Sequence, residues 1–451
     1  MITLNKKNSF FTLIATNDKN KKYLEKKHLE VTTFLEEETV CVYFDKKVTD
    51  IELGDFFIAF ATSNKRNLNV NLDSFTELSG IEIGRLTYII LTTLGVFYKL
   101  PVNLKTDKTE KVIEYNFATN QDIRNIFEEC EVIVGAMEKT RRLQELPFNF
   151  LNAVQFTKIV KEELTKCTNV TVKELNKKNI EELEMGLLLG VNRGSAFEPR
   201  ILIIEYKGNS KSDEKTVLVG KGITFDTGGY NIKPDAYMKN MKFDMGGAAI
   251  VAHTILAISN LKIKTNFTAV CVLTDNSIGP DAFRCDDVLT SMSGKTVEIT
   301  NTDAEGRLIL ADGVTYAVQK LKATRVITIA TLTGAISIAL GHEYTGLFSD
   351  NDNLATDFQN AAIKANELIW RMPLSDKYHG EKNRKSRIAD ILQACGREAS
   401  SSVAAAFMWQ FTEKVPYLHL DIAGTDVRND NIATSCMLKS FVELAKISEN
   451  K

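Results

Sequence analysis

Short apolar runs alternate with longer helical ones along the C-terminal part of the chain, and this alternation constrains the fold more than any other feature. The short runs are rich in β-branched residues and predict strands, whereas the longer runs have helical periodicity. The predicted strands are residues 201–206, 216–219, 267–273, 296–300, 325–331 and 418–422. The predicted helices are residues 154–167, 247–261, 308–321, 402–413 and 433–447. This order is typical of a largely parallel or mixed sheet with helices on both faces.

The length of 451 residues favours two domains over one. The turn-forming sequence Leu146-Pro147-Phe148-Asn149 marks a change of pattern, so we place the boundary near residues 139–149. This predicts an N-terminal α/β domain over residues 1–145 and a second α/β domain over residues 146–451. In the first domain, residues 40–44 and 56–61 resemble strands, and residues 81–97 are apolar enough for a buried helix, or a helix followed by a strand.

Charge and cysteine content narrow the class of protein. The formal net charge of -2 gives no field that favours nucleic acid or an anionic membrane. The seven cysteines include no CxxC pair, which indicates free thiols in a reducing compartment. The apolar stretch 10–15 is too short for a signal peptide, and no apolar run approaches the ~20 residues of a membrane span. We therefore expect a cytoplasmic protein that binds neither nucleic acid nor membrane.

Acidic residues follow two of the predicted strands, where ligands gather in sheets of this kind. Asp303 and Glu305 lie two apart in the sequence NTDAEGRL, so in an extended chain their side chains would share one face. Two neighbouring carboxylates repel each other unless a cation lies between them. This spacing favours a shared metal ion.

A second segment supplies further oxygen ligands. Asp226 lies in VGKGITFDTGG and Asp244 in KFDMGG, both beside glycines that permit close approach of the backbone. Four carboxylates without a nearby histidine suit a pair of zinc, manganese or magnesium ions, which would activate a shared water for hydrolysis. Either segment alone could instead form turns or bind phosphate, although the spacing of a P-loop is missing.

Together the three blocks resemble the leucyl aminopeptidase family of two-metal cytosol aminopeptidases. The later runs ATLTGA (330–335) and HLDIAGT (419–425) extend the resemblance, which covers residues from about 141 to the C-terminus. The resemblance implies one metal held by Lys221, Asp226, Asp244 and Glu305, and another held by Asp226, Asp303 and Glu305. As a ligand, Lys221 must lose its proton, which an adjacent dication favours by lowering the pKa from ~10.4.

The same resemblance implies the remaining roles. Lys233 would stabilise the oxyanion, and Arg307 would hold a bicarbonate ion that shuttles a proton. The metals would be zinc or manganese, with cobalt or magnesium as further candidates. The pocket for the first side chain would be lined by Met241, Thr331, Leu332 and Gly334, and would favour leucine or other apolar residues with broad specificity. Substrates would be peptides with a free N-terminus.

The family also implies a homohexamer and an N-terminal domain similar to a macrodomain. Two alternatives remain: a two-metal phosphoesterase, and a non-catalytic scaffold or binding member of the family. We interpret His253, His342 and His419 as structural residues rather than metal ligands. The chain departs from the family at Tyr230, at Cys285-Asp286-Asp287 and at Asp275-Asn276-Ser277-Ile278, which puts loop shape and pocket access in question.

Overall fold

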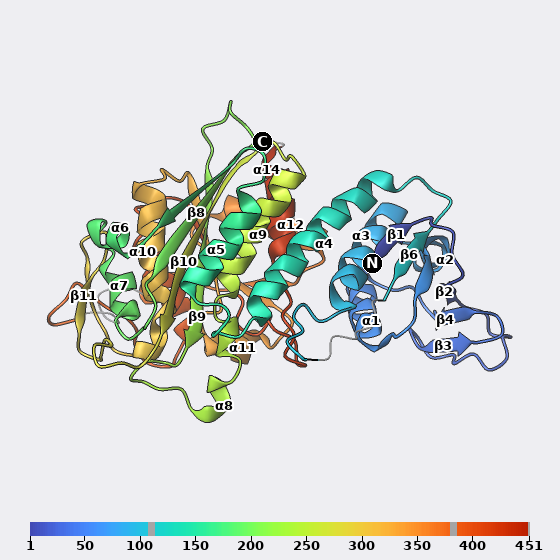
Figure 1. The fold of residues 1–451 in the computed structure, drawn as a ribbon, viewed down its shortest axis with the longest axis horizontal. Coiled ribbons are helices and arrows are strands. Elements are labelled where there is room, and N and C mark those ends of the chain that lie inside the picture. Colours follow the sequence, from blue (N-terminus) through green and yellow to red (C-terminus); the bar gives the residue numbers. More distant parts are fainter. Residues whose placement is uncertain (107–112, 379–385, 450–451) are drawn as a thin grey trace. The chain divides into compact units, whose positions relative to one another are not determined.

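The computed structural model describes residues 1–106, 113–378 and 386–449. It divides into two compact units, Met1–Glu138 and Lys139–Lys451, each with a sheet of its own (Figure 1). We call them the N-terminal unit and the C-terminal unit. The predicted α/β class is confirmed in both.

The N-terminal unit contains a six-stranded sheet with the order β1-β6-β5-β2-β4-β3. All neighbouring strands are parallel except β3 and β4. The strands are β1 (Ile2–Leu4), β2 (Phe11–Thr16), β3 (Val31–Phe34), β4 (Thr39–Tyr43), β5 (Leu68–Asn71) and β6 (Tyr115–Ala118). The helices that lie wholly in this unit are α1 (Asp50–Ser63), α2 (Leu72–Ser79) and α3 (Ile83–Phe97), whereas α4 (Arg124–Glu145) begins in it and ends in the C-terminal unit. The strand predicted at residues 40–44 is β4, and residues 81–97 form one helix rather than a helix followed by a strand.

The strand predicted at residues 56–61 is wrong, because this segment belongs to helix α1. A capping box starts the helix: the Thr49 side chain accepts from the backbone of Glu52, and the Glu52 side chain accepts from the backbone of Thr49. The buried apolar residues Leu53, Phe57 and Phe60 recur at helical spacing. The helical spacing is not visible within residues 56–61 alone, because Leu53 lies outside that segment.

The C-terminal unit contains a mixed eight-stranded sheet with the order β15-β14-β17-β13-β9-β10-β8-β7. Its central strands β17, β13, β9 and β10 run parallel, so their carboxyl ends meet at one edge. The strands are β7 (Val170–Leu175), β8 (Arg200–Lys207), β9 (Thr216–Asp226), β10 (Asn266–Asn276), β13 (Arg325–Ala330), β14 (Thr345–Ser349), β15 (Ile369–Arg371) and β17 (Tyr417–Asp421).

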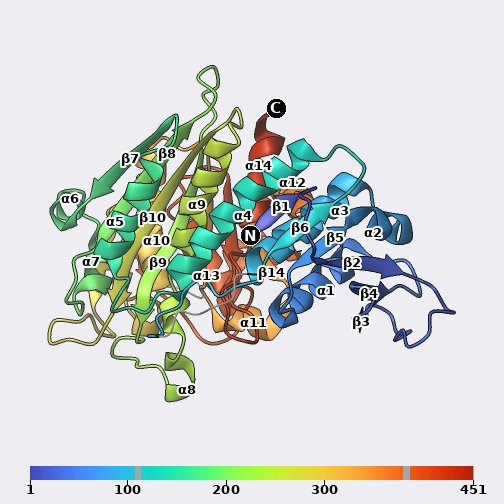
Figure 2. The same cartoon turned by 45° about the vertical axis from the view of Figure 1, so that its right-hand side comes forward.

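Helices cover both faces of this sheet, as predicted. One face carries α5 (Ala153–Leu164) and α9 (Gly246–Asn260), which lie across β8, β9 and β10 (Figures 1 and 2). The other carries α10 (Gly306–Gln319), and successive residues of β9 show the alternation. Gly220 faces the backbone of α9, whereas its neighbour Val219 lies against Gly313 of α10. The remaining helices of this unit include α7 (Gly186–Asn192), α11 (Gly334–Leu340), α12 (Asp352–Ala365), α13 (Ser400–Trp409) and α14 (Leu438–Glu449).

Three predicted boundaries need correction. β9 extends well beyond Val219, so Lys221 lies inside the strand rather than after it. The strand predicted at residues 296–300 is shortened to β12 (Thr296–Glu298), and it pairs with β11 (Val288–Thr290) and β16 (Ile391–Leu392) in a separate small sheet. The last predicted helix begins only at Leu438, because Ser435 and Met437 have positive φ angles.

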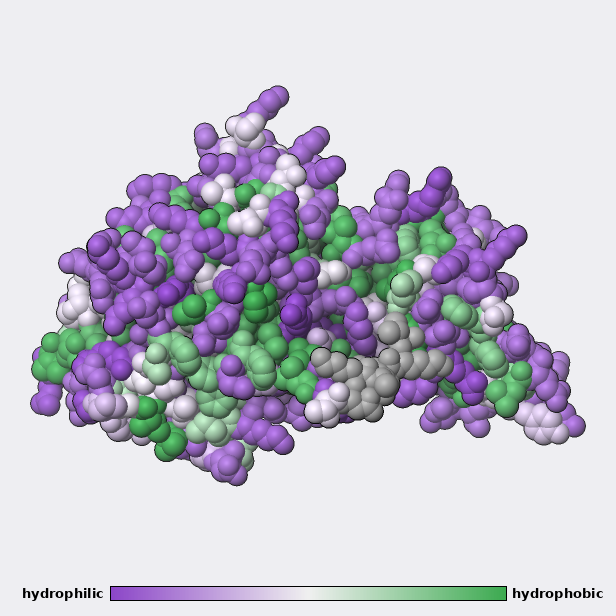
Figure 3. All heavy atoms as spheres, viewed as in Figure 1, coloured by the Kyte–Doolittle hydropathy of each residue, from purple (hydrophilic) through white to green (hydrophobic). Residues whose placement is uncertain are grey.

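The longest apolar helical segments among the described residues are largely buried in the protein. One helical stretch, Asp235–Asn260, is long and apolar enough to cross a membrane, but 89% of its apolar window is buried in the protein. Helices α2 and α3 meet the same criterion only as a pair, which is bent by 118°. Hydrophilic side chains cover most of the face seen in Figure 3, with smaller hydrophobic areas among them.

The buried carboxylate of Asp312 connects helix α10 to the backbone of two other segments, and the strength of this connection can be tested. Asp312 in α10 is 0% exposed and accepts hydrogen bonds from the backbone N–H groups of Leu187, Leu188 and Met292. We expect Asp312→Asn to lower the free energy of unfolding by about 1–3 kcal/mol, because one amide oxygen replaces two acceptors. The measurement is chemical unfolding, with the exposed Asp213→Asn as the control.

The same variant reports a pH effect. Burial raises the pKa of Asp312 from 3.8 to about 7, although its three backbone hydrogen bonds oppose the shift. Between these values the folded protein binds a proton that the unfolded chain does not, so wild-type stability falls as the pH rises. The stability difference from Asp312→Asn should therefore be larger at about pH 5 than at about pH 8. An equal difference at both would contradict the assignment.

Candidate metal site

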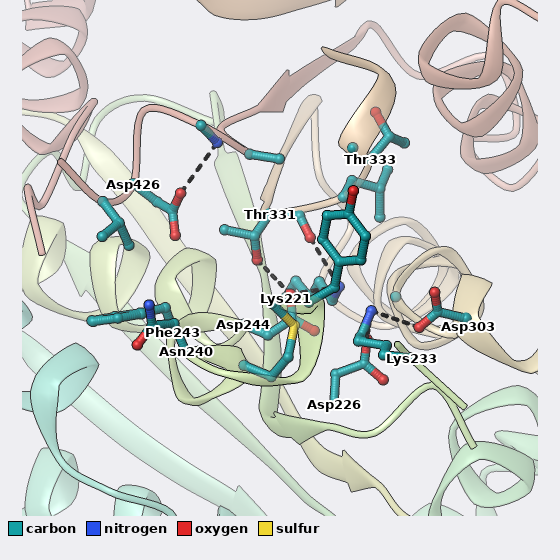
Figure 4. A pocket seen from close by; sticks show the side chains of 18 of the residues that line it. Lys221, Asp226, Lys233, Asn240, Phe243, Asp244, Asp303, Thr331, Thr333 and Asp426 are labelled. Carbon is teal, nitrogen blue, oxygen red and sulfur yellow. Dashed lines mark hydrogen bonds and ion pairs between the residues drawn. The ribbon is translucent and has the colours of Figure 1, made fainter. Parts of the chain in front are cut away.

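A pocket of about 620 Å³ opens at the carboxyl edge of the central strands (Figure 4). Segments that follow β9, β13 and β17 line it, together with the start of α10. The predicted site residues Lys221, Asp226, Lys233, Met241, Asp244, Asp303, Glu305, Arg307, Thr331, Leu332 and Gly334 all line this pocket. The structure thus brings together residues that are up to about a hundred positions apart in the chain.

Three buried carboxylates form the centre of the site. One oxygen each of Asp226, Asp244 and Glu305 lies within 4.8 Å of the other two. Asp244 Oδ2 and Glu305 Oε2 are buried and have no hydrogen-bond partner among the described residues. Buried acceptors without donors are unfavourable, so these oxygens are suited to a bound cation.

Lys221 reaches this centre from inside β9. Its Nζ lies 2.8 Å from Asp244 Oδ1 and 3.0 Å from Glu305 Oε1, and it donates to the carbonyl oxygen of Thr331. Burial alone would lower the pKa of Lys221, but the carboxylates of Asp244, Glu305 and Asp226 outweigh it and raise the pKa. In turn, burial and the neighbouring carboxylates raise the pKa of Asp244 despite the attraction of Lys221.

Lys233 forms a second bridge between carboxylates. Its Nζ lies 2.8 Å from Asp226 Oδ2 and 2.6 Å from Asp303 Oδ1. Burial, followed by repulsion from Asp226, raises the pKa of Asp303 from 3.8 to about 6, and Lys233 reduces this shift. Asp303 therefore lies beside the central carboxylates, and Lys233 connects it to one of them, Asp226.

The extended geometry predicted for Asp303 and Glu305 is wrong. Residues Thr302–Ala304 form a 3-10 turn that leads directly into α10, and the Asn301 side chain caps the turn by accepting from Asp303 N. The turn directs the two carboxylates to different lysines, Lys233 and Lys221. Arg307 follows in the first turn of α10, is 6% exposed and donates to the carbonyl oxygen of Gln393.

Two glycines allow the chain to turn sharply beneath Asp303. Gly228 and Gly229 have φ angles of +84° and +61°, which non-glycine residues rarely adopt. A Cβ on Gly228 would lie 2.5 Å from the carbonyl oxygen of Asn231, and one on Gly229 would lie 2.9 Å from Thr302 Oγ1. A side chain at either position would push apart the two acidic segments.

Asp421, in the sequence HLDIAGT, has no role predicted from the sequence. It ends β17, is fully buried, and accepts from the backbone of Leu332 and from Thr333 Oγ1 at 3.1 and 2.6 Å. These bonds fix the loop after β13, whose Thr331 donates from Oγ1 to Asp244 at 2.6 Å. Asp421 is thus a positioning residue, and its signal was a lone acid at the end of an apolar strand.

The three histidines lie apart from the central carboxylates. His253 contacts Glu163 at 3.2 Å, and His419 contacts Thr328 at 2.9 Å, both in the interior. His342 lies on the pocket wall, where its Nδ1 is 3.0 Å from the carbonyl oxygen of Gly424. Carboxylate oxygens and two lysines therefore dominate the site, as suits divalent cations of the zinc, manganese or magnesium kind.

Comparison with known proteins places this site in a family context. A model of the cytosol aminopeptidase family, catalytic domain, matches residues 138–442. A probable cytosol aminopeptidase of Metamycoplasma salivarium is 42% identical over 433 residues, which cover 94% of this chain and 82% of the relative. Another from Mycoplasma pneumoniae is 42% identical over 374 residues, covering 82% and 83%. A third, from Protochlamydia amoebophila, is 44% identical over 321 residues, covering 71% and 64%.

The carboxylate geometry predicts stabilisation by divalent cations. Zinc or manganese ions that bind only the folded protein should raise its thermal midpoint as their concentration increases. Glu305→Gln should abolish most of this rise, since it removes a central negative charge, whereas the exposed Asp235→Asn should retain it. Differential scanning fluorimetry against metal concentration measures the effect. Equal stabilisation of both variants would show that the ions bind elsewhere.

Proposed function

Because the chain belongs to the cytosol aminopeptidase family, we propose that this peptidase depends on two divalent metal ions and removes the first residue of peptides in the cytoplasm. The observation that carries the proposal is the buried group of Asp226, Asp244 and Glu305, with an oxygen from each within 4.8 Å of the others. The zinc and manganese ions expected from the resemblance suit these ligands, with cobalt or magnesium as further candidates.

We assign one metal to Lys221, Asp226, Asp244 and Glu305, and the other to Asp226, Asp303 and Glu305. Support comes from the two ammonium groups, which lie between the carboxylates where positive charge is needed. The unsatisfied oxygens of Asp244 and Glu305 give further support. Lys221 becomes a ligand only as the neutral amine, so metal binding at this site releases a proton.

When bound, a pair of divalent ions supplies Lewis acidity and lowers the pKa of a shared water. Lys233 lines the pocket beside Asp226 and Asp303, where its ammonium group stabilises negative charge on the oxygen of the scissile carbonyl. Arg307, whose guanidinium is buried against Gln393 at the pocket, is the proposed binding group for bicarbonate. Asp421 holds the loop that presents Thr331 to Asp244.

Met241, Thr331, Leu332 and Gly334 are the proposed contacts for the first side chain of the peptide. Met241 offers an apolar, adaptable surface for leucine or a similar residue. Apolar burial separates similar side chains by only ~1–3 kcal/mol, so we propose a preference rather than strict selection.

We further propose that the protein assembles as a homohexamer, as the family resemblance implies. The cytoplasmic location is supported by the names of the relatives, which are probable cytosol aminopeptidases.

The role of Lys233 can be tested directly. We expect Lys233→Met to lower kcat for leucine anilide by about 100-fold or more, because charge stabilisation acts mainly on the transition state. The exposed Lys239→Met, six positions further along the connection between β9 and α9, is the matched control. Steady-state kinetics with zinc or manganese supplied give the result, and undiminished kcat in Lys233→Met would refute the assignment.

The same assay separates the alternatives. An aminopeptidase loses activity on leucine anilide after chelation and regains it with zinc or manganese. A two-metal phosphoesterase would hydrolyse a phosphate ester instead. A scaffold would hydrolyse neither substrate with any metal.

A further inference from the structure

Asp426 is an acidic residue in the same pocket that the proposed metal site does not use. It follows β17, is 7% exposed and lines the cavity. In the view of Figure 4 its carboxylate lies across the pocket from Lys233 and Asp303, with Thr331 and Asp244 between them. Its Oδ1 accepts from the backbone N–H of Gly424 at 3.3 Å.

No lysine, arginine or histidine forms an ion pair with Asp426 in the parts of the chain that the structure describes. The nearby guanidinium of Arg428 pairs with Asp430 Oδ2 at 3.1 Å, and His342 bonds the carbonyl oxygen of Gly424. Burial raises the pKa of Asp426 to about 7, and the charge of Asp421 adds to the shift although backbone N–H groups oppose it. The pocket thus carries an acid that has no counter-cation among the described side chains.

A buried carboxylate is unfavourable unless a positive charge or sufficient hydrogen bonds compensate it. Asp426 faces an open cavity, so a ligand can bring that charge. The proposed substrate can carry a positive charge on two groups: the amine of its first residue, which we place at the metal site beside the scissile bond, and a basic side chain. Only the side chain remains to reach Asp426.

We propose that Asp426 is a specificity-determining residue that binds the ammonium or guanidinium group of an N-terminal lysine or arginine. The inference rests on the proposed aminopeptidase function and names a substrate class for it. Lysine and arginine have apolar stems, which pack on Met241 as leucine does, and a cationic end that reaches further. The pocket therefore accepts basic residues in addition to apolar ones.

The wild-type metal-loaded enzyme gives the first test. Lysyl and norleucyl anilides share an unbranched four-carbon side chain, to which lysine adds a terminal ammonium group. We expect kcat/KM to be about tenfold higher or more for the lysyl substrate, since a partly buried charge pair forms only with lysine. An equal or higher value for the norleucyl substrate would overturn the proposal.

A variant series gives the second test. Asp426→Asn should reduce the ratio of lysyl to norleucyl kcat/KM by about tenfold. Glu343→Gln is the matched control, because it removes the same charge from an exposed position next to His342 and should leave the ratio unchanged. An unchanged ratio in Asp426→Asn would overturn the proposal, and if that variant does not fold, the wild-type ratio decides.

Failure of the underlying function has a different signature. If the wild-type protein hydrolyses no aminoacyl anilide with zinc or manganese, the proposed aminopeptidase activity itself is refuted. If it hydrolyses norleucyl and leucyl anilides better than lysyl and arginyl anilides, only the role of Asp426 is refuted.

Discussion

Mutual repulsion of buried carboxylates is the constraint on which the rest of the site depends. Asp226, Asp244 and Glu305 converge from β9, from the turn before α9 and from the start of α10. Such a group is unstable without positive charge among its members. Lys221 and Lys233 supply that charge within the chain, and their position between the acids marks where divalent ions would act.

The fold holds these charges together through backbone geometry rather than through apolar packing alone. Parallel central strands end at one edge, so the segments after β9, β13 and β17 meet there. The left-handed turn at Gly228 and Gly229 brings the chain under Asp303, and Asp421 locks the loop that carries Thr331. Both features restrict the conformations of a loop that carries site residues, which lowers the free-energy cost of holding like charges close together.

Much of this could be predicted from the sequence, because apolar runs and acid-glycine motifs are local signals. The central strands lie where the apolar runs predict them, and all the predicted site residues line one pocket, although their chemical roles stay predictions. The extended geometry predicted for Asp303 and Glu305 is wrong, because spacing alone cannot distinguish a strand from the 3-10 turn capped by Asn301. Asp421 and Asp426 were not assigned a role, since only tertiary structure shows which buried acid meets a donor and which meets a cavity.

The contrast between those two acids explains how one pocket can use the same chemistry in different ways. Asp421 is fully buried, and both of its carboxylate oxygens accept hydrogen bonds from the loop after β13, so neither is available to a ligand. Asp426 lies five positions later, lines the cavity, and its Oδ1 accepts from the backbone N–H of Gly424. A carboxylate whose oxygens already accept hydrogen bonds from the protein has a structural role. A carboxylate that faces a cavity without a counter-cation can instead bind a positively charged ligand that enters the cavity. We place the central carboxylates and Asp426 in the second kind, with a metal ion as the proposed source of positive charge for the former and the substrate for the latter.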